Sequence, residues 1–179
     1  MLLDLNKLQG QREHVERALP SSAFEPQDDQ YRLIAPVELS MDVQKAGDDV
    51  FHVTGSFRTR LELDCSRCLE PFELPVEASF DLRYFPQTAN AGEGEREIEE
   101  EDLTTAYYRD GVLDVIDLLR EQLQLALPMK PLHDEACRGL CPVCGGNLNR
   151  TDCDHSSKWE DPRLAPLKGL LARDREKES

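Results

Sequence analysis

Apolar and polar residues alternate along most of the chain between residues 36 and 84. In three successive stretches every second side chain is apolar, which is the period of a β-strand with one buried face. These stretches run from Val37 to Val43, from Val50 to Asp64 and from Leu74 to Tyr84. Turn-forming residues separate the first two stretches at 45–49, and a cysteine pair separates the second from the third. The order predicts an antiparallel meander, because short connections join antiparallel neighbours.

Two details refine this prediction. The alternation in the second stretch changes phase near Gly55, which predicts a β-bulge at that residue. After residue 112 the period becomes helical, with apolar residues at 3-4-4 spacing from Ile116 to Leu127, a capping Asp114 and a terminating Pro128. We expect this helix to cover the apolar face of the sheet, which gives an α+β fold in which an antiparallel β meander is packed by a helix.

The remaining segments carry weaker patterns. An acidic linker is indicated by the seven acids that accompany the single Arg96 between Gly92 and Asp102. Leucines at helical spacing predict a tail helix near the C-terminus. The chain therefore divides into a weakly patterned N-terminal segment (1–30), the antiparallel β region with the first cysteine pair (31–86), the acidic linker (87–111), the core helix (112–128), a zinc-knuckle segment (129–158) and the C-terminal tail helix (159–179).

Charge narrows the classes of function. The chain of 179 residues has 36 Asp+Glu against 21 Lys+Arg, a formal charge of −15. Such acidity argues against a broad nucleic-acid surface, since that kind of binding depends on neutralised phosphates. The chain contains no apolar run long enough to span a membrane and no export signal at its start, so we expect a cytoplasmic protein. In that reducing compartment six cysteines indicate metal or redox chemistry more than disulfides.

The later cysteines contain a complete set of zinc ligands. Cys141 and Cys144 are three residues apart in a turn with two following glycines, which is the arrangement of a zinc knuckle. Cys153 and His155 follow after a short loop and complete a tetrahedral set. The alternative is a free thiol at position 153 and an exposed histidine at position 155. The surrounding segment is rich in Gly, Pro and Asn and has no hydrophobic period, so metal rather than apolar burial would hold it together.

The earlier pair, Cys65 and Cys68, forms a second knuckle between two predicted strands. A thioredoxin-like redox pair has the same spacing but precedes a helix, so the strand context argues against it. His133 and Cys137 remain as candidate partners, and the eight residues together would hold two zinc ions. A single-ion alternative joins Cys65 and Cys68 with Cys141 and Cys144, and zinc content per chain distinguishes the two arrangements.

Several motifs resemble the bacterial YceD family. They occur in order as CSRCLEPF at 65–72, DLLRE at 117–121, LPMKP at 127–131, GLCPVCGGNLN at 139–149 and DPRLAPL at 161–167. The resemblance implies a role in accumulating large-subunit (23S) ribosomal RNA. The resemblance also implies that the first site is self-sufficient, because some members of the family lack the later knuckle. This chain carries His133 and His155 where the family often has cysteine, and both residues remain zinc donors.

Three classes of function are therefore compared. The first is a non-catalytic, zinc-stabilised factor that promotes accumulation of 23S ribosomal RNA, with local RNA contacts through arginines near the knuckles: Arg58, Arg60, Arg67, Arg138 and Arg150. The second is an acidic protein that binds a basic ribosomal protein, which suits the −15 charge. The third is an enzyme, but each zinc set fills all four positions, and no nucleophile grouping or phosphate-binding loop accompanies it. We expect that the protein neither acts on a small-molecule substrate nor associates with a membrane.

Overall fold

The computed structural model describes residues 1–8, 12–25, 30–87 and 103–155. The chain divides into two compact units. The first comprises Met1–Cys65 and Glu70–His133 and holds the described helices and strands. The second comprises Ser66–Leu69 and Asp134–Ser179, of which residues 66–69 and 134–155 are described.

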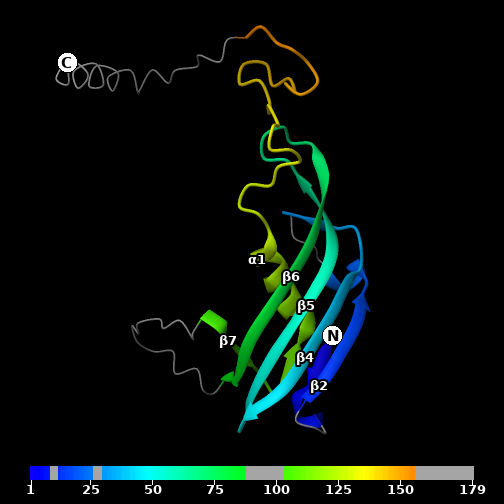
Figure 1. The fold of residues 1–179 in the computed structure, drawn as a ribbon, viewed down its shortest axis with the longest axis vertical. Helices are drawn as coiled ribbons and strands as arrows, with labels where there is room; N and C mark the ends of the chain where they lie inside the picture. Colours follow the sequence, from blue (N-terminus) through cyan, green and yellow to red (C-terminus); the bar gives the residue numbers. More distant parts are fainter. Residues whose placement is uncertain (9–11, 26–29, 88–102, 156–179) are drawn as a thin grey trace, which may run out of the picture. The chain divides into compact units, whose positions relative to one another are not determined.

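A six-stranded sheet forms the framework of the first unit. Its strands lie in the order β2-β4-β5-β6-β7, with β3 paired to β5 outside this path (Figure 1). All of these pairs are antiparallel except β6 and β7, which are parallel. The strands are β2 (Arg12–Leu19), β3 (Arg32–Leu33), β4 (Val37–Gly47), β5 (Val50–Asp64), β6 (Pro71–Pro86) and β7 (Thr105–Tyr108).

The meander predicted from the alternation is confirmed. β4 and β5 pair antiparallel around the turn at 48–49, and β5 and β6 pair without a break from Phe51↔Tyr84 to Asp64↔Pro71. The inward side chains are the ones the pattern selects, with Val43, Phe57 and Val76 all buried. The register follows from the burial, because a slip of one residue would turn every apolar side chain outward.

The bulge predicted at Gly55 is wrong. Gly55 pairs regularly with Met41 on one side and Phe80 on the other, and the register shift of this hairpin lies between Lys45 and Gly47. Phe51, Val53, Gly55 and Phe57 all occupy the same face, so the phase of the strand never changes. Gly55 is an inward position without a side chain. A Cβ there would lie 2.7 Å from both Met41 Cβ and Phe80 Cζ and 2.8 Å from the Ser40 carbonyl oxygen.

We therefore expect Gly55→Ala to lower the free energy of unfolding by about 1–3 kcal/mol, the usual cost of overpacking a filled core. Urea unfolding followed by circular dichroism measures this. Gly47→Ala is the matched control, because a Cβ there meets only Val50 atoms at 3.8–3.9 Å. If Gly55→Ala and Gly47→Ala had equal effects, close packing at position 55 would be refuted.

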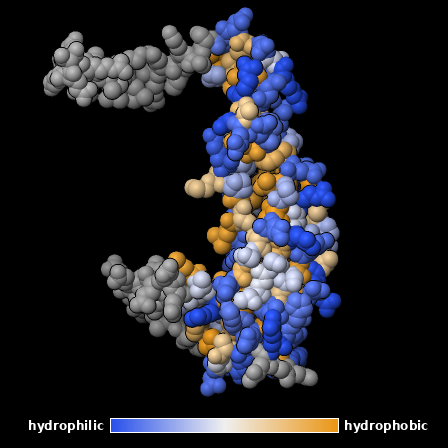
Figure 2. Space-filling model, viewed as in Figure 1, coloured by the Kyte–Doolittle hydropathy of each residue, from blue (hydrophilic) through white to orange (hydrophobic). Residues whose placement is uncertain are grey.

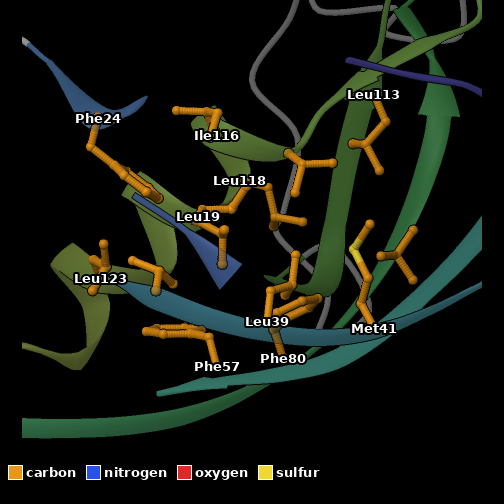
Figure 3. Packing of buried hydrophobic residues seen from close by; sticks show 14 of the residues in the cluster. Leu19, Phe24, Leu39, Met41, Phe57, Phe80, Leu113, Ile116, Leu118 and Leu123 are labelled. Carbon is orange, nitrogen blue, oxygen red and sulfur yellow. The ribbon is translucent and has the colours of Figure 1, made fainter. Parts of the chain in front are cut away.

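Helix α1 (Val115–Ala126) packs on the inner face of this sheet (Figure 1). The Asp114 carboxylate caps it by accepting a hydrogen bond from the Ile116 amide at 2.9 Å, and Leu127 adopts the extended conformation that a following proline favours. Figure 3 shows strand side chains such as Leu19 and Leu39 facing Leu118 of α1. Phe24, from the 3-10 turn after β2, belongs to the same cluster. Leu119 and Leu123 are fully buried. The α+β class is thus confirmed.

Short elements complete the first unit. β1 (Leu2–Asp4) pairs antiparallel with β8 (Val112–Asp114), and two 3-10 turns cover Leu5–Lys7 and Ser21–Phe24. The predicted acidic linker 87–111 requires a correction, because residues 105–108 form β7 and Tyr108 is buried. The acidic stretch between Gly92 and Asp102 and the predicted tail helix 159–179 lie outside the described residues.

The outer face of the sheet is covered by paired charges. A cross-strand ion pair joins Arg12 to Asp42 at 2.9 Å, and a cross-strand hydrogen bond joins His52 Nε2 to Asp81 Oδ1 at 2.6 Å. Hydrogen bonds from Arg12 and then His14 lower the pKa of Asp42, and the Asp42 carboxylate raises the pKa of His14. Figure 2 shows hydrophilic side chains over most of the visible surface. Charge neutralisation across strands makes this face unsuited to a concentrated anion such as a phosphate backbone.

Candidate metal centres

The first cysteine pair occupies the turn of the β5–β6 hairpin. The Cys65 amide donates to the Glu70 carbonyl at 2.9 Å, which closes the turn, and Leu69 takes a positive φ of 59°. Cys65 and Cys68 are 0% and 3% exposed. Two thiols in a short turn point to one side, which is the geometry that a knuckle needs.

His133 and Cys137 lie with this pair. One ligand atom from each of Cys65, Cys68, His133 and Cys137 falls within 4.8 Å of the others. Cys137 is held by a turn in which its amide donates to the Asp134 carbonyl at 3.1 Å, while the Asp134 carboxylate accepts from the Ala136 amide at 2.7 Å. This cluster could hold a metal ion.

A second cluster forms around Cys141, Cys144, Cys153 and His155, whose ligand atoms also lie within 4.8 Å of one another. The knuckle is closed by Gly145, whose amide donates to the Cys141 carbonyl at 2.8 Å and whose φ is 72°. Cys153 Sγ lies 3.2 Å from Cys141 Sγ and 3.2 Å from His155 Nδ1. This cluster could also hold a metal ion.

Hydrogen bonds within the second cluster shift the pKa values of two of its thiols in opposite directions. Backbone amides of Cys144 and Val143, followed by the Cys153 thiol, lower the pKa of Cys141 to about 6. The hydrogen bond that Cys153 donates to Cys141 in turn raises the pKa of Cys153. All six cysteines are free thiols. A thiolate is the metal-binding form of cysteine, so Cys141 is ready to bind at neutral pH.

Asn149 links the knuckle segment to Cys137, which the sequence reasoning missed. Its side-chain amide donates to Cys137 Sγ at 3.3 Å, and its side-chain carbonyl accepts from the Arg138 amide at 2.8 Å. A hydrogen bond to a ligand sulfur stabilises thiolate charge and fixes the ligand's orientation. The only sequence signal was the Asn-rich loop after the second knuckle, which does not say where its amides point.

The burial pattern differs between the two units. The apolar core cluster consists entirely of residues between Leu5 and Leu123, in the first unit. Within residues 66–69 and 134–155 the buried side chains are those of Cys68, Cys137 and Cys141. The described part of the second unit therefore buries metal-ligand side chains and lacks an apolar core of its own.

The five arginines proposed for RNA contact have specific surroundings. Arg58 and Arg60 form ion pairs with Glu38 at 3.3 Å and Glu73 at 3.6 Å on the outer sheet face. Arg138 pairs with Asp152 at 3.1 Å, and Arg150 lies in the knuckle segment.

Arg67 has a different environment, because its guanidinium donates to the carbonyls of Glu135 and Cys137, both at 2.8 Å. Its own carbonyl accepts from the Leu140 amide at 3.0 Å. The Arg67 side chain thus stabilises the backbone of residues 135–137 beside the candidate ligand Cys137. The structure does not gather the five arginines into one basic patch, since at least three of them are opposed by carboxylates.

The single-ion grouping of Cys65, Cys68, Cys141 and Cys144 does not appear among the described residues. The two clusters there take two cysteines from one knuckle each and complete the set with His133 and Cys137 or with Cys153 and His155. No described helix has both the length and the apolar character needed to cross a bilayer.

Residues 53–171, more than half of the chain, match the family model described as "Large ribosomal RNA subunit accumulation protein YceD". The chain belongs to the YceD family. The match spans both knuckles and all eight clustered cysteines and histidines. By its description, the family is named for accumulation of the large ribosomal RNA subunit.

Proteins similar to this chain occur in plants and in bacteria. The chain is 29% identical to "Large ribosomal RNA subunit accumulation protein YCED homolog 1, chloroplastic" of Zea mays, over 76% of this chain and 54% of that protein. The protein with the same description from Arabidopsis thaliana is 27% identical over 80% of this chain and 51% of its own length. An uncharacterized Mycobacterium leprae protein is 26% identical, over 78% of this chain and 61% of its own length. The chain spans about half the length of these plant relatives. No solved structure matches.

Proposed function

We propose that this YceD protein is a non-catalytic, zinc-stabilised factor that promotes accumulation of large-subunit (23S) ribosomal RNA during ribosome biogenesis in the cytoplasm. The family match and the names of the plant relatives support the ribosomal role. The observation that carries the zinc part is the burial of cysteines where the second unit would otherwise need an apolar core.

The donor sets suit zinc. Cys₃His is a common structural zinc set, and a tetrahedral ion with Zn–S bonds of about 2.3 Å separates its sulfurs by about 3.8 Å. The ligand atoms of both clusters lie within 4.8 Å of one another, close to that spacing. Cys65, Cys68, His133 and Cys137 would hold one ion, and Cys141, Cys144, Cys153 and His155 the other. A bound ion would neutralise thiolate charge and hold together the two chain segments that supply the four ligands of each cluster.

The number of protein ligands at each cluster argues against a catalytic zinc. A catalytic zinc keeps one coordination position open for water or substrate, whereas each cluster here offers four protein donors. The ions are therefore proposed as structural. A thiol redox role is disfavoured as well, because the Cys65–Cys68 pair occupies a hairpin turn rather than a helix start.

Charge favours a basic protein of the large subunit as the direct partner. Arg58, Arg60 and Arg138 are opposed by carboxylates, which lowers their attraction for phosphate. A chain with a charge of −15 attracts a basic protein at long range and shields its surface from unwanted contacts with RNA. Binding a basic ribosomal protein would also promote rRNA accumulation, because the RNA needs that protein in order to assemble into the subunit.

Co-purification from cells at moderate salt, with and without nuclease, tests both candidates. We expect recovery of a basic large-subunit protein that survives nuclease and weakens at high salt, because the attraction is electrostatic. Recovery of large-subunit RNA that is lost on Arg150→Ala, but kept in the control Arg32→Ala on the sheet, would instead establish direct RNA contact. Absence of every large-subunit component from both preparations would contradict the ribosomal role.

A further inference from the structure

A crevice of about 460 Å³ lies between strand β7 and helix α1 in the first unit. Its walls come from the end of β6, from β7, from β8 and from one side of α1. Three tyrosines line it: Tyr84, Tyr107 and Tyr108. The metal clusters lie elsewhere in the sequence, and the proposed zinc role uses none of the residues of this crevice.

Tyr84 is a buried polar side chain without a hydrogen bond. It is 5% exposed, and its hydroxyl has no hydrogen-bonding partner among the described residues. The Tyr84 hydroxyl nevertheless keeps some solvent exposure. Among the described residues, the fully buried side-chain polar atom without a hydrogen bond is Asn147 Nδ2. Tyr84 is one of the residues that line the crevice. Burial and the nearby Glu121 carboxylate raise the pKa of Tyr84, so the hydroxyl stays protonated.

Glu121 supplies an uncompensated charge beside this hydroxyl. Two other carboxylates of the crevice are engaged, since Asp114 caps α1 and Asp117 pairs with Arg120 at 3.0 Å. Glu121 forms no ion pair with a described residue, and its place in the second turn of the helix is too far from the N-terminus for the helix dipole to neutralise it. The one cation on the wall is Arg109, which lines the opposite, strand side.

We propose that this crevice binds a lysine or arginine side chain of a basic polypeptide. The Glu121 carboxylate would accept a charge-assisted hydrogen bond from the cation, and the Tyr84 oxygen would accept a second. Tyrosine rings suit the remainder of the ligand, because an ammonium or guanidinium group is attracted to aromatic faces.

The geometry favours a side chain on a polypeptide over a metal ion or a free small cation. The carboxylates of the crevice do not form a group close enough to hold a metal among the described residues. β7 is the last strand in the order of the described sheet, and a strand in that position is where an extended peptide commonly adds to a sheet. A bound strand would place its alternate side chains beside the crevice. The ligand proposed for the crevice is basic, like the protein partner of the second candidate function, but the crevice itself does not depend on that function.

The experiment uses the full zinc-loaded chain and a capped pentapeptide with a central arginine as the probe. The comparison peptide carries citrulline, which keeps the shape of arginine and removes its charge. Titration followed by NMR should shift the resonances of Tyr84, Tyr107 and Glu121 with the arginine peptide and leave them nearly unchanged with citrulline. Spermidine and a short RNA oligonucleotide form the two further arms.

Matched variants identify the contacts. We expect Glu121→Gln to weaken binding of the arginine peptide about tenfold, since a charge-assisted hydrogen bond is lost. Tyr84→Phe keeps the ring and removes one acceptor, so a loss of about threefold is expected. Glu77→Gln, an exposed acid on the outer face of β6, removes the same charge and should leave binding unchanged.

Three results would overturn the proposal. Equal effects of Glu121→Gln and Glu77→Gln would reduce the binding to general attraction by an acidic chain. Spermidine binding the crevice as tightly as the peptide would make the ligand a free polyamine. Shifts at the crevice with RNA and not with the peptide would assign it to nucleic acid. Any of these would leave zinc content and co-purification unaffected, so the proposed function is tested separately.

Discussion

Removing the metal should unfold residues 134–155 while the six-stranded sheet persists. Structural zinc contributes on the order of 10 kcal/mol to small modules of this kind. The described part of the second unit has no apolar cluster to compensate for that loss, because its buried side chains are Cys68, Cys137 and Cys141. Without the ion these thiols would also repel one another on ionisation. The first unit has its own core and should remain folded.

Limited proteolysis and hydrogen exchange, before and after strong chelation at neutral pH, measure this outcome. We expect new cleavage between residues 134 and 155 and unchanged protection in β4, β5 and β6. Metal analysis should find two zinc ions per chain. Cys153→Ser should reduce the content to one by removing a ligand of the second cluster, and the exposed Ser66→Ala in the first knuckle should leave it at two.

Two findings would refute this arrangement. Unchanged protease resistance after chelation would show that metal does not hold the segment. One zinc ion per chain that survives the double variant His133→Ala and His155→Ala would instead favour the single-ion grouping of the four knuckle cysteines.

The largest effect on the first unit is expected from Phe57→Ala. Phe57 is 1% exposed at the centre of β5, and its ring packs among core side chains near α1 (Figure 3). Deleting a buried phenylalanine ring lowers the free energy of unfolding by about 3–5 kcal/mol, through lost burial and the cavity that remains. Such a loss is a large part of the stability of a typical domain.

Urea unfolding measures this change, and the neighbouring Ser56→Ala is the control on the opposite, exposed face of the same strand. That control should change stability by less than about 0.5 kcal/mol. If Phe57→Ala does not fold, Phe57→Leu gives a smaller loss of the same sign. A loss below about 1 kcal/mol for Phe57→Ala would mean that the contact between sheet and helix is not the core of the unit.

Much of the candidate site was accessible to sequence reasoning because its ligands are local. Cys65 and Cys68 fall in one turn, Cys141 and Cys144 in another, and cysteine chemistry at that spacing is specific. Asn149 and Arg67 were not accessible in the same way, because their roles depend on contacts with residues 12 and 70 positions away. The arginines show the reverse problem. Their number near the knuckles suggested an RNA surface, but pairing with carboxylates across strands is visible only in the fold.

The strands at the sheet margins show the same limit. β2 has one buried residue, Leu19, so it leaves almost no alternation to read, yet all eight of its residues pair with β4. β7 follows an acidic stretch and pairs parallel with β6, a connection that no local pattern encodes. Gly55 was misread because an inward position without a side chain looks like a change of phase.

By itself, the sequence determined the features that depend on near neighbours: the period-two strands β4 to β6, the capped helix α1 and the two cysteine knuckles. Each arises from the local geometry of a turn, a strand or a helix, and a regular period records it. Only the tertiary structure decided how the histidines and cysteines group, which charges pair across strands, and that Tyr84 and Glu121 meet in one crevice. Those relations join residues far apart in the chain, and their energies depend on burial and distance, which the order of residues does not record.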